Sequence, residues 1–323
     1  MLTRIFHILL KKINFLAIFF YNKNFYLINS PLQYINLVEY LNKNKFAKKY
    51  PLIVGYSNIS SVQQVKLLNL DYFKYEKIFY LIDILDVKIF HKILSLKKFI
   101  FGFDNCVIGD FNYYLFKEFY KYSKKITILD DGTSTFEIIK KKFKKKTIFF
   151  SFFENLKSNN LIFVRNNFNF LKSKIKKLRF DSKIIYIVGS ASVERKILPK
   201  SIFSKIINLI LAKNKDKIIY YVPHRLETDL REVKNFKRIK IKKFKLPLEV
   251  SLIREEKIPK KIISFYSTCL FTLNKIYGSK IKYYNFNYNL KNISDKRIRL
   301  RHLIIHKEFK KQGIKNFIYK NII

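Results

Sequence analysis

Short apolar runs alternate with amphipathic runs along most of this chain, and this alternation restricts its fold more than any other feature. Residues 25–43 begin with an apolar run, continue through a Ser-Pro turn, and then place Leu37 and Leu41 at helical spacing. Short apolar runs bounded by turn residues predict strands, and apolar residues three or four positions apart predict helices. Their repetition predicts an α/β fold with parallel sheets and helices on both faces.

Two such series are present. After the opening strand, the first series predicts strands at 50–57, 77–82, 105–110 and 124–132, and helices at 61–70, 87–98 and 112–123. The second series predicts strands at 183–188, 216–224, 260–267 and 279–287, a strand and helix within 239–253, and helices at 199–213 and from 296. Between the series, the lysine run 140–146 predicts a solvated loop, and the stretch to about residue 179 predicts a crossover.

The length of 323 residues fits two domains of ordinary size. We divide the chain into an N-terminal basic and apolar segment (1–24), a first domain (25–165) and a second domain with a basic tail (166–323). Hydrophobic residues make up 49% of the chain, which excludes a disordered protein despite the large charge.

The formal net charge of +43 predicts attraction to phosphates, whether in nucleic acid, nucleotides or anionic lipid. A compositional explanation stands beside this one. Lys, Ile, Asn, Phe and Tyr dominate while Gly and Pro are scarce, as expected when a coding sequence drifts toward A and T. Basicity alone therefore does not identify a ligand.

Cys106 and Cys269 are the only cysteines, which is too few for a disulfide framework and fits a reducing compartment. The apolar start has no signal-peptide cleavage site, and its longest unbroken apolar run, 15–21, is too short to span a bilayer. Lys11 and Lys12 among apolar residues fit a helix lying on anionic lipid. A first helix buried against the protein body fits equally well.

Polar and small residues follow several of the expected strands. In open parallel sheets, ligands bind beyond the carboxyl ends of the strands, so we expect these residues to line a site. They are Ser30, Asp130, Asp131, Gly132, Gly189, Ser190, Pro223, His224, Arg225, Ser267 and Thr268.

Each motif has a catalytic or binding interpretation and a structural one. A carboxylate of Asp130 or Asp131 can act as a general base, although the pair also suits a turn or a helix cap. His224 can donate to a phosphate oxygen or protonate a leaving group. Ser267 and Thr268 can bind a phosphate at a helix start or simply cap that helix.

Other chemistry is absent from the sequence. There is no Walker loop, HExxH, GxSxG or clustered His/Cys set, and the turn at 189–190 is not a dinucleotide fingerprint. We therefore expect no metal and no cofactor.

Taken in order, the motifs "DDG" at 130–132, "PHR" at 223–225 and "YST" at 266–268 resemble those of bacterial sialyltransferases, above all the lipooligosaccharide sialyltransferase and polysialyltransferase-like group. "SPLQ" with Ser30 and Gln33, "GSASVE" at 189–194 and "LPLEVSL" with Glu249 extend the resemblance over about residues 25–290. Proline precedes His224 instead of following it, which is closer to the polysialyltransferase-like branch.

The resemblance implies a GT-B fold, in which two Rossmann-like domains face each other across a cleft. It implies an acceptor-side first domain and a second domain for the nucleotide sugar. The implied activity is inverting, metal-independent transfer of sialic acid from CMP-sialic acid to a sugar of a bacterial lipooligosaccharide or capsule.

The resemblance also implies residue roles. Asp130 would be the general base, with Asp131 as its support or as the alternative base. His224 would stabilise or protonate the departing phosphate. Glu249, Gly189 and Ser190 would lie near the cytidine. The remaining substrate-binding residues would be Ser30, Gln33, Gly132, Pro223, Arg225, Ser267 and Thr268.

Two alternatives stay open. One is a GT-B enzyme with another nucleotide sugar, and the other is a non-enzymatic basic protein that binds nucleic acid. The lysines form no stripe and no nucleic-acid module is present, so we expect no nucleic-acid partner. We expect a cytoplasmic enzyme on the inner face of the cell membrane, contacting anionic lipid through residues 1–20 and 296–311. The sequence does not indicate the oligomeric state.

Overall fold

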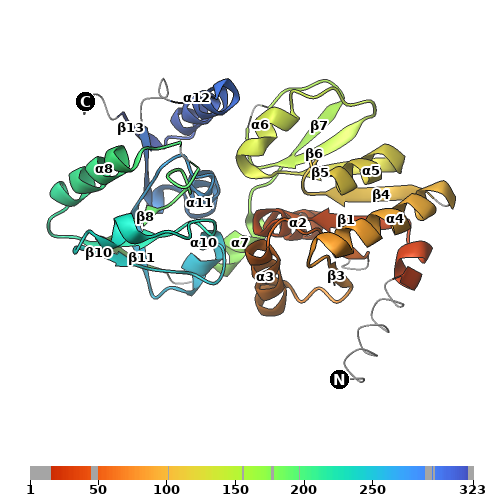
Figure 1. Ribbon diagram of the computed structural model, residues 1–323, viewed down its shortest axis with the longest axis horizontal. Helices are drawn as coiled ribbons and strands as arrows, with labels where there is room; N and C mark the ends of the chain where they lie inside the picture. Colours follow the sequence, from red (N-terminus) through yellow and green to blue (C-terminus); the bar gives the residue numbers. More distant parts are fainter. Residues whose placement is uncertain are drawn as a thin grey trace. The chain divides into compact units, whose positions relative to one another are not determined.

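The computed structural model describes residues 16–44, 50–100, 102–154, 156–175, 178–195, 197–287, 293 and 295–318. The chain divides into two compact units, residues 1–170 and 171–323. Figure 1 shows each unit as a layer of strands accompanied by helices.

The first unit is built on a seven-stranded sheet with the order β3-β2-β1-β4-β5-β6-β7. All of its strand pairs are parallel. The strands are β1 (Asn24–Ile28), β2 (Leu52–Val54), β3 (Ile78–Tyr80), β4 (Phe103–Ile108), β5 (Ser123–Leu129), β6 (Thr147–Ser151) and β7 (Leu161–Arg165).

Helical segments connect the successive strands from β1 to β6, as is usual in a parallel sheet. They are α2 (Pro31–Lys43), α3 (Ile59–Leu68), the π-helical η1 (Asn69–Phe73), α4 (Ile84–Ile100), α5 (Tyr114–Tyr122), the 3-10 turn η2 (Gly132–Ser134) and α6 (Thr135–Ile138). Helix α7 (Asn169–Lys174) contains the division between the units.

The second unit has a six-stranded parallel sheet with the order β10-β9-β8-β11-β12-β13. Its strands are β8 (Arg179–Val188), β9 (Ile218–Val222), β10 (Ile239–Ile241), β11 (Lys257–Ser264), β12 (Lys282–Asn287) and β13 (Lys315–Ile318). Its helices are α8 (Lys200–Ala212), α9 (Arg231–Lys234), α10 (Leu248–Ser251), η3 (Leu252–Arg254), α11 (Cys269–Tyr277), η4 (Gly278–Lys280) and α12 (Lys296–Lys311).

Both sheets have the doubly wound order, in which the chain runs outward from a central strand and then crosses to its other side. The prediction of an α/β fold with two parallel sheets is confirmed. In the first sheet the direction changes between β1 and β4, and in the second between β8 and β11. Ligand sites in such sheets lie at this switch point, beyond the carboxyl ends of the strands.

The stretch after the lysine run differs from the prediction. We expected a crossover without strands from residue 147 to about 179, but β6 and β7 extend the first sheet there. Every residue of β6 is at least partly buried, so it has no polar face to mark an alternation. The basic and Asn-rich segments that flank β6 and β7 also make their strand pattern harder to recognise in the sequence. The final strand β13 was also not predicted.

The helix at residues 16–21 packs into the core of the first unit. Phe19 is fully buried, and its ring contacts those of Phe25 and Phe90 with centroids 5.2 and 5.1 Å apart. The rings of Phe103 and Phe119 complete this aromatic cluster, 4.6 Å from each other. The described part of the N-terminal segment therefore belongs to the core, whereas residues 1–15 lie outside the described residues.

A buried lysine holds the end of this helix. Lys97 of α4 has no exposed surface, and its ammonium group donates to the carbonyl oxygens of Phe19, Phe20 and Asn22, the last two at 2.9 and 2.6 Å. The same group lies 5.0 Å from the centre of the Phe19 ring. Burial lowers the pKa of Lys97 to about 8. The amine thus supplies donors to carbonyls that a helix leaves unpaired at its C-terminus.

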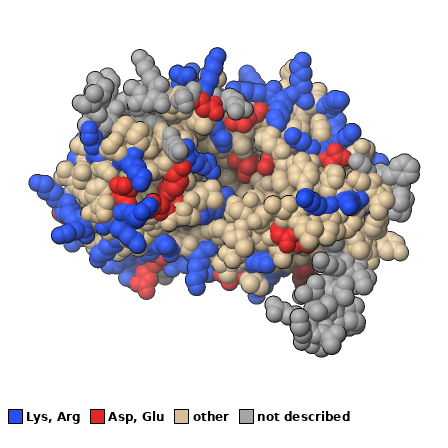
Figure 2. All heavy atoms as spheres, viewed as in Figure 1, with Lys and Arg blue, Asp and Glu red and all other residues tan. Residues whose placement is uncertain are grey.

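Surface charge is dispersed. On the face shown in Figure 2, Lys and Arg side chains are spread over both units, and Asp and Glu are few. Among the described residues, no helix combines the length and apolarity needed to cross a bilayer.

Replacing Lys97 by Met should destabilise the first unit by about 2 kcal/mol or more, because the carbonyls of the 16–21 helix would be buried without donors. Urea denaturation would measure the change. Lys124→Met is the matched control, since Lys124 is 79% exposed and forms only a surface ion pair with Asp104, worth less than about 1 kcal/mol. Equal midpoints for the two variants would contradict the role of Lys97.

Candidate functional site

The acidic pair follows β5, and its first carboxylate is enclosed. Asp130 has no exposed surface. Its Oδ1 accepts from the Gly132 backbone N–H at 2.8 Å and the Thr135 hydroxyl at 2.6 Å, and its Oδ2 accepts from the Ser151 hydroxyl. Gly132 has a φ of 64°, which brings its N–H back toward the carboxylate at no steric cost. Asp130 therefore fixes the turn from within.

Burial is the main cause that raises the pKa of Asp130, which reaches about 7, and the nearby charge of Asp131 acts in the same direction. The hydrogen bonds from the three donors oppose this rise. The backbone of Asp130 is also held, because Asn36 of α2 donates to its carbonyl oxygen at 2.8 Å. The residue is thus tied to the helix that follows β1 as well as to its own turn.

The second carboxylate is partly exposed. Asp131 Oδ1 accepts from the Ser30 hydroxyl at 3.4 Å, and Oδ2 accepts from the Ser134 hydroxyl at 3.1 Å. Ser30 in turn caps α2, because its Oγ accepts from the Gln33 N–H at 3.3 Å. The structure therefore brings Ser30, Asp131 and the start of α2 together, although Ser30 and Asp131 lie far apart in sequence.

Gln33 lies at the switch point of the first sheet. It is fully buried, and its Oε1 accepts from the Asn29 N–H at 2.8 Å. A Cβ at Gly109, just after β4, would come within 2.2 Å of this Oε1, so the glycine makes room for the glutamine. Gln33 therefore bonds the backbone just after β1 and packs against Gly109 just after β4.

In the second unit, the turns after β8 and β9 meet at one carboxylate. Glu227 accepts from the backbone N–H groups of Ser190 and Ala191 at 3.1 and 2.9 Å, and from that of His224 at 2.9 Å. The Tyr221 hydroxyl donates to the same carboxylate at 3.1 Å. The sequence-predicted residues Gly189, Ser190 and His224 thus lie next to one another around a residue that we did not predict.

His224 is held in one tautomer. Its Nδ1 accepts from the Leu226 N–H at 3.2 Å, so the neutral ring carries its proton on Nε2. Burial is the main cause that lowers the pKa of His224, which falls to about 4, and the charges of Arg225 and Arg195 contribute in the same direction. The ring is therefore neutral near pH 7 and offers an N–H donor. Pro223 precedes it and is partly buried, whereas Arg225 is exposed.

Ser267 and Thr268 lie between β11 and α11, beside the turn after β8, because β8 and β11 are paired. The Ser267 hydroxyl donates to Cys269 Sγ at 3.2 Å. Thr268, the N-cap of α11, makes no side-chain capping bond, whereas the Ser267 Oγ accepts from the Cys269 N–H at 3.4 Å. The side chain of Thr268 therefore does not cap α11.

Glu249 is buried on α10, where its Oε1 accepts from the Thr272 hydroxyl of α11 at 2.6 Å. Burial raises the pKa of Glu249. It joins α10 to the helix that follows Ser267, and the Tyr277 hydroxyl of the same helix donates to its carbonyl oxygen at 3.1 Å.

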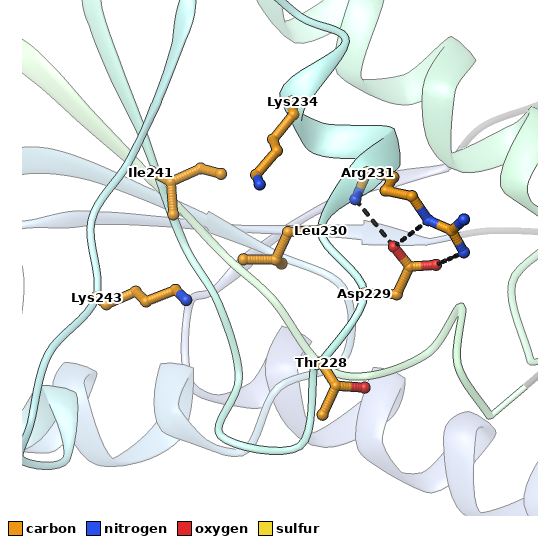
Figure 3. Close-up of a pocket in the computed structure, with 7 residues that line it drawn as sticks. All are labelled: Thr228, Asp229, Leu230, Arg231, Lys234, Ile241 and Lys243. Carbon is orange, nitrogen blue, oxygen red and sulfur yellow. Dashed lines mark hydrogen bonds and ion pairs between the residues drawn. The ribbon is translucent and has the colours of Figure 1, made fainter.

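A pocket of about 770 Å³ is lined by residues that directly follow the turn after β9 in the sequence, together with residues of and next to β10. Figure 3 shows the ammonium groups of Lys234 and Lys243 pointing toward Leu230, while Arg231 and Asp229 pair with each other at 2.8 Å. Its lining residues are Thr228, Asp229, Leu230, Arg231, Lys234, Ile241 and Lys243. Cationic groups over an apolar floor suit an anionic ligand.

The sequence did not reveal the groups that fix these turns. The hydroxyl groups of Ser151 and Thr135 donate to Asp130. Ser151 lies on β6, however, in the stretch for which the sequence predicts a crossover. Glu227 had one signal, since it follows His224 by three residues and can reach back to its N–H, as the glutamate of a capping box does. Among the described residues, no group of three or more His, Cys, Asp or Glu could hold a metal ion.

No protein-family model and no curated protein matches the sequence. The chain is similar to the solved structure of a Listeria monocytogenes protein named as a UDP-N-acetylglucosamine 2-epimerase. The TM-score is 0.52 and the identity 10%, over 82% of this chain and 79% of that chain. A glycosyltransferase from Rickettsia africae ESF-5 aligns over 91% of this chain and 90% of its own, with 13% identity and a TM-score of 0.37.

The first similarity and the two doubly wound sheets confirm the predicted GT-B fold class. An identity of 10% shows the fold and does not transfer a substrate.

Replacing Asp130 by Asn should change how stability depends on pH. With a folded-state pKa near 7, raised from 3.8, Asp130 stays protonated in the fold between pH 4 and 7 while the unfolded chain ionises. Its contribution to stability therefore falls as pH rises through this window. D130N lacks that loss, so its stability relative to wild type should increase from pH 4 to 7.

Urea denaturation at several pH values measures this difference. Asp104→Asn is the control, because Lys124 holds the pKa of exposed Asp104 below its usual value and it stays ionised throughout the window. A D130N difference that is as flat as that of D104N would refute the raised pKa.

Proposed function

We propose that the protein is an inverting glycosyltransferase that transfers sialic acid from CMP-sialic acid to a hydroxyl group of a bacterial surface glycan. The observation that carries the proposal is the distribution of the three motifs over a GT-B fold. The acidic pair ends β5 in the first unit, and the phosphate-binding candidates end β8, β9 and β11 in the second. The sialyltransferase resemblance supplies the donor.

We assign the general base to Asp131. Asp130 is enclosed and both of its oxygens accept hydrogen bonds, whereas Asp131 is partly exposed at the same turn. In the reaction, the acceptor oxygen forms a bond to the anomeric carbon of sialic acid as its proton passes to Asp131. The bond from that carbon to the phosphate oxygen breaks, and CMP leaves with the electron pair. Asp130 holds the turn that presents this carboxylate.

His224 contributes a hydrogen bond and not a proton in this proposal. Its neutral ring presents Nε2–H, which can stabilise the negative charge that develops on the phosphate. The hydroxyl groups of Ser190 and Ser267 follow the two neighbouring strands at the switch point and suit the same nucleotide. No metal or other cofactor is part of the proposed reaction.

The observation that favours membrane contact is the outer face of α12. Lys296, Leu300, Leu303, Lys307 and Lys310 recur at three- and four-residue spacing and are all exposed, while Ile305 and Phe309 on the other face are buried. Leu300 and Leu303 are 50% and 42% exposed. A helix with lysines beside exposed leucines suits the surface of an anionic membrane, where a glycolipid acceptor would be found.

Incubation with CMP-sialic acid and a panel of galactose- and sialic-acid-terminated glycans tests the activity. We expect release of CMP together with a sialylated product detected by mass spectrometry. Release of UDP from UDP-sugars in place of CMP would instead support a GT-B enzyme with a different donor.

Asp131→Asn should lower kcat by more than about 100-fold, because the acceptor hydroxyl loses its proton acceptor. Affinity for CMP, measured by calorimetry, should not change, since the acidic pair belongs to the first unit. Asp104→Asn is the control on the same unit, far from the turn in sequence, and should keep full activity. A D131N enzyme with wild-type kcat would exclude Asp131 as the base, and loss of activity in D130N alone would give that role to Asp130.

Replacing both Leu300 and Leu303 by Ser should weaken binding to vesicles of phosphatidylcholine and phosphatidylserine, because the apolar contact is lost while the lysines remain. Co-sedimentation at low salt measures the bound fraction. Wild-type protein should not sediment with pure phosphatidylcholine vesicles. Equal sedimentation with both kinds of vesicle, or with neither, would contradict an anionic membrane as the partner.

A further inference from the structure

We infer that Glu227 is a positioning residue of the nucleotide site, and that its carboxylate joins the turn after β8 to the turn after β9. The inference rests on the proposed function, because it assigns these two turns to the nucleotide. Glu227 is not one of the residues that the sequence motifs single out. Its part in the site follows from the contacts of its carboxylate.

The carboxylate is filled by donors from both turns. Oε1 accepts from the N–H groups of Ser190 and Ala191, and Oε2 accepts from that of His224. Tyr221 donates its hydroxyl to both oxygens at 3.1 Å. Three backbone amides and a phenol therefore meet at one charged group, and hydrogen bonds to a charged acceptor are the stronger kind.

The backbone is shaped to receive this carboxylate. Gly189 has no Cβ, and a Cβ there would lie 2.1 Å from Oε2 and 2.5 Å from Oε1 of Glu227. Ala191 has a φ of 53°, an unfavourable conformation for a residue with a side chain, and its N–H is one of those bound. The N–H of Glu227 also donates to the His224 carbonyl at 2.8 Å, which closes the turn.

A neutral side chain cannot replace the carboxylate. All of its partners donate, so the amide NH₂ of a glutamine would face either the His224 N–H or the pair from Ser190 and Ala191. One of the two turns would then lose its partner. Because the Leu226 N–H that selects the His224 tautomer belongs to the same closed turn, loss of Glu227 should also disturb that imidazole.

Two variants test this by different routes. Glu227→Gln removes the charge, and Gly189→Ala keeps the charge but displaces the carboxylate. Each should weaken CMP binding by about tenfold or more, the effect of leaving a buried donor unpaired. Glu232→Gln is the matched control, since Glu232 lies nearby in sequence, forms only a 3.5 Å ion pair with Lys200, and should bind CMP as wild type does.

The second measurement reads the imidazole directly. The protein has five histidines, so ¹⁵N-histidine NMR resolves His224 once its signals are assigned with His224→Asn. In wild type and E232Q we expect a neutral Nε2–H ring, and in E227Q and G189A a changed tautomer or titration. Simple loss of stability would not alter these signals below the unfolding transition.

The outcomes separate the two hypotheses. If wild type does not bind CMP, the proposed function fails, and the imidazole signals still decide the role of Glu227. Unchanged imidazole signals with unchanged CMP affinity in E227Q would overturn the inference. Should E227Q and G189A fail to fold, Tyr221→Phe removes one of the four donors, and unchanged His224 signals in that variant would equally overturn it.

Discussion

Backbone N–H groups are left without strand partners where parallel strands end, and two carboxylates satisfy several of them in this protein. In the first unit Asp130 accepts from the N–H of Gly132. In the second, Glu227 accepts from those of Ser190, Ala191 and His224. A buried donor without a partner is costly, so each turn is held in the conformation that its carboxylate selects. The surrounding side chains are placed by these turns.

This constraint separates two kinds of acidic residue. Asp130 is enclosed and Glu227 is partly buried; each accepts hydrogen bonds from backbone N–H groups, and burial raises the pKa of each. Asp131 is partly exposed and accepts from the hydroxyl groups of Ser30 and Ser134. In a chain with 66 Lys and Arg against 23 Asp and Glu, two of the few carboxylates are thus used to build turns. The residue beside the buried acid is the one to which the proposed function assigns the general base.

The sequence predicted the architecture well because the alternation of strand and helix is a local property. Helices α3, α8 and α12 and most strands lie where the periodicity placed them. It failed at β6 and β7. Strand β6 is short and has no exposed residue, so it offers no alternation to detect. The clustering of Ser30 with Asp131, and of Gly189 with His224, followed from one rule, that the carboxyl ends of parallel strands share an edge.

The sequence by itself determined the two parallel sheets and the residues at their strand ends, since both follow from short-range patterns of apolar and turn residues. Only the tertiary structure decided which acid of "DDG" is enclosed, because that depends on Ser151, which the neighbouring strand β6 brings to Asp130. The tertiary structure also identified Glu227, whose partners come from two different strand ends. Burial and convergent donors arise from contacts between distant segments, which no local pattern records.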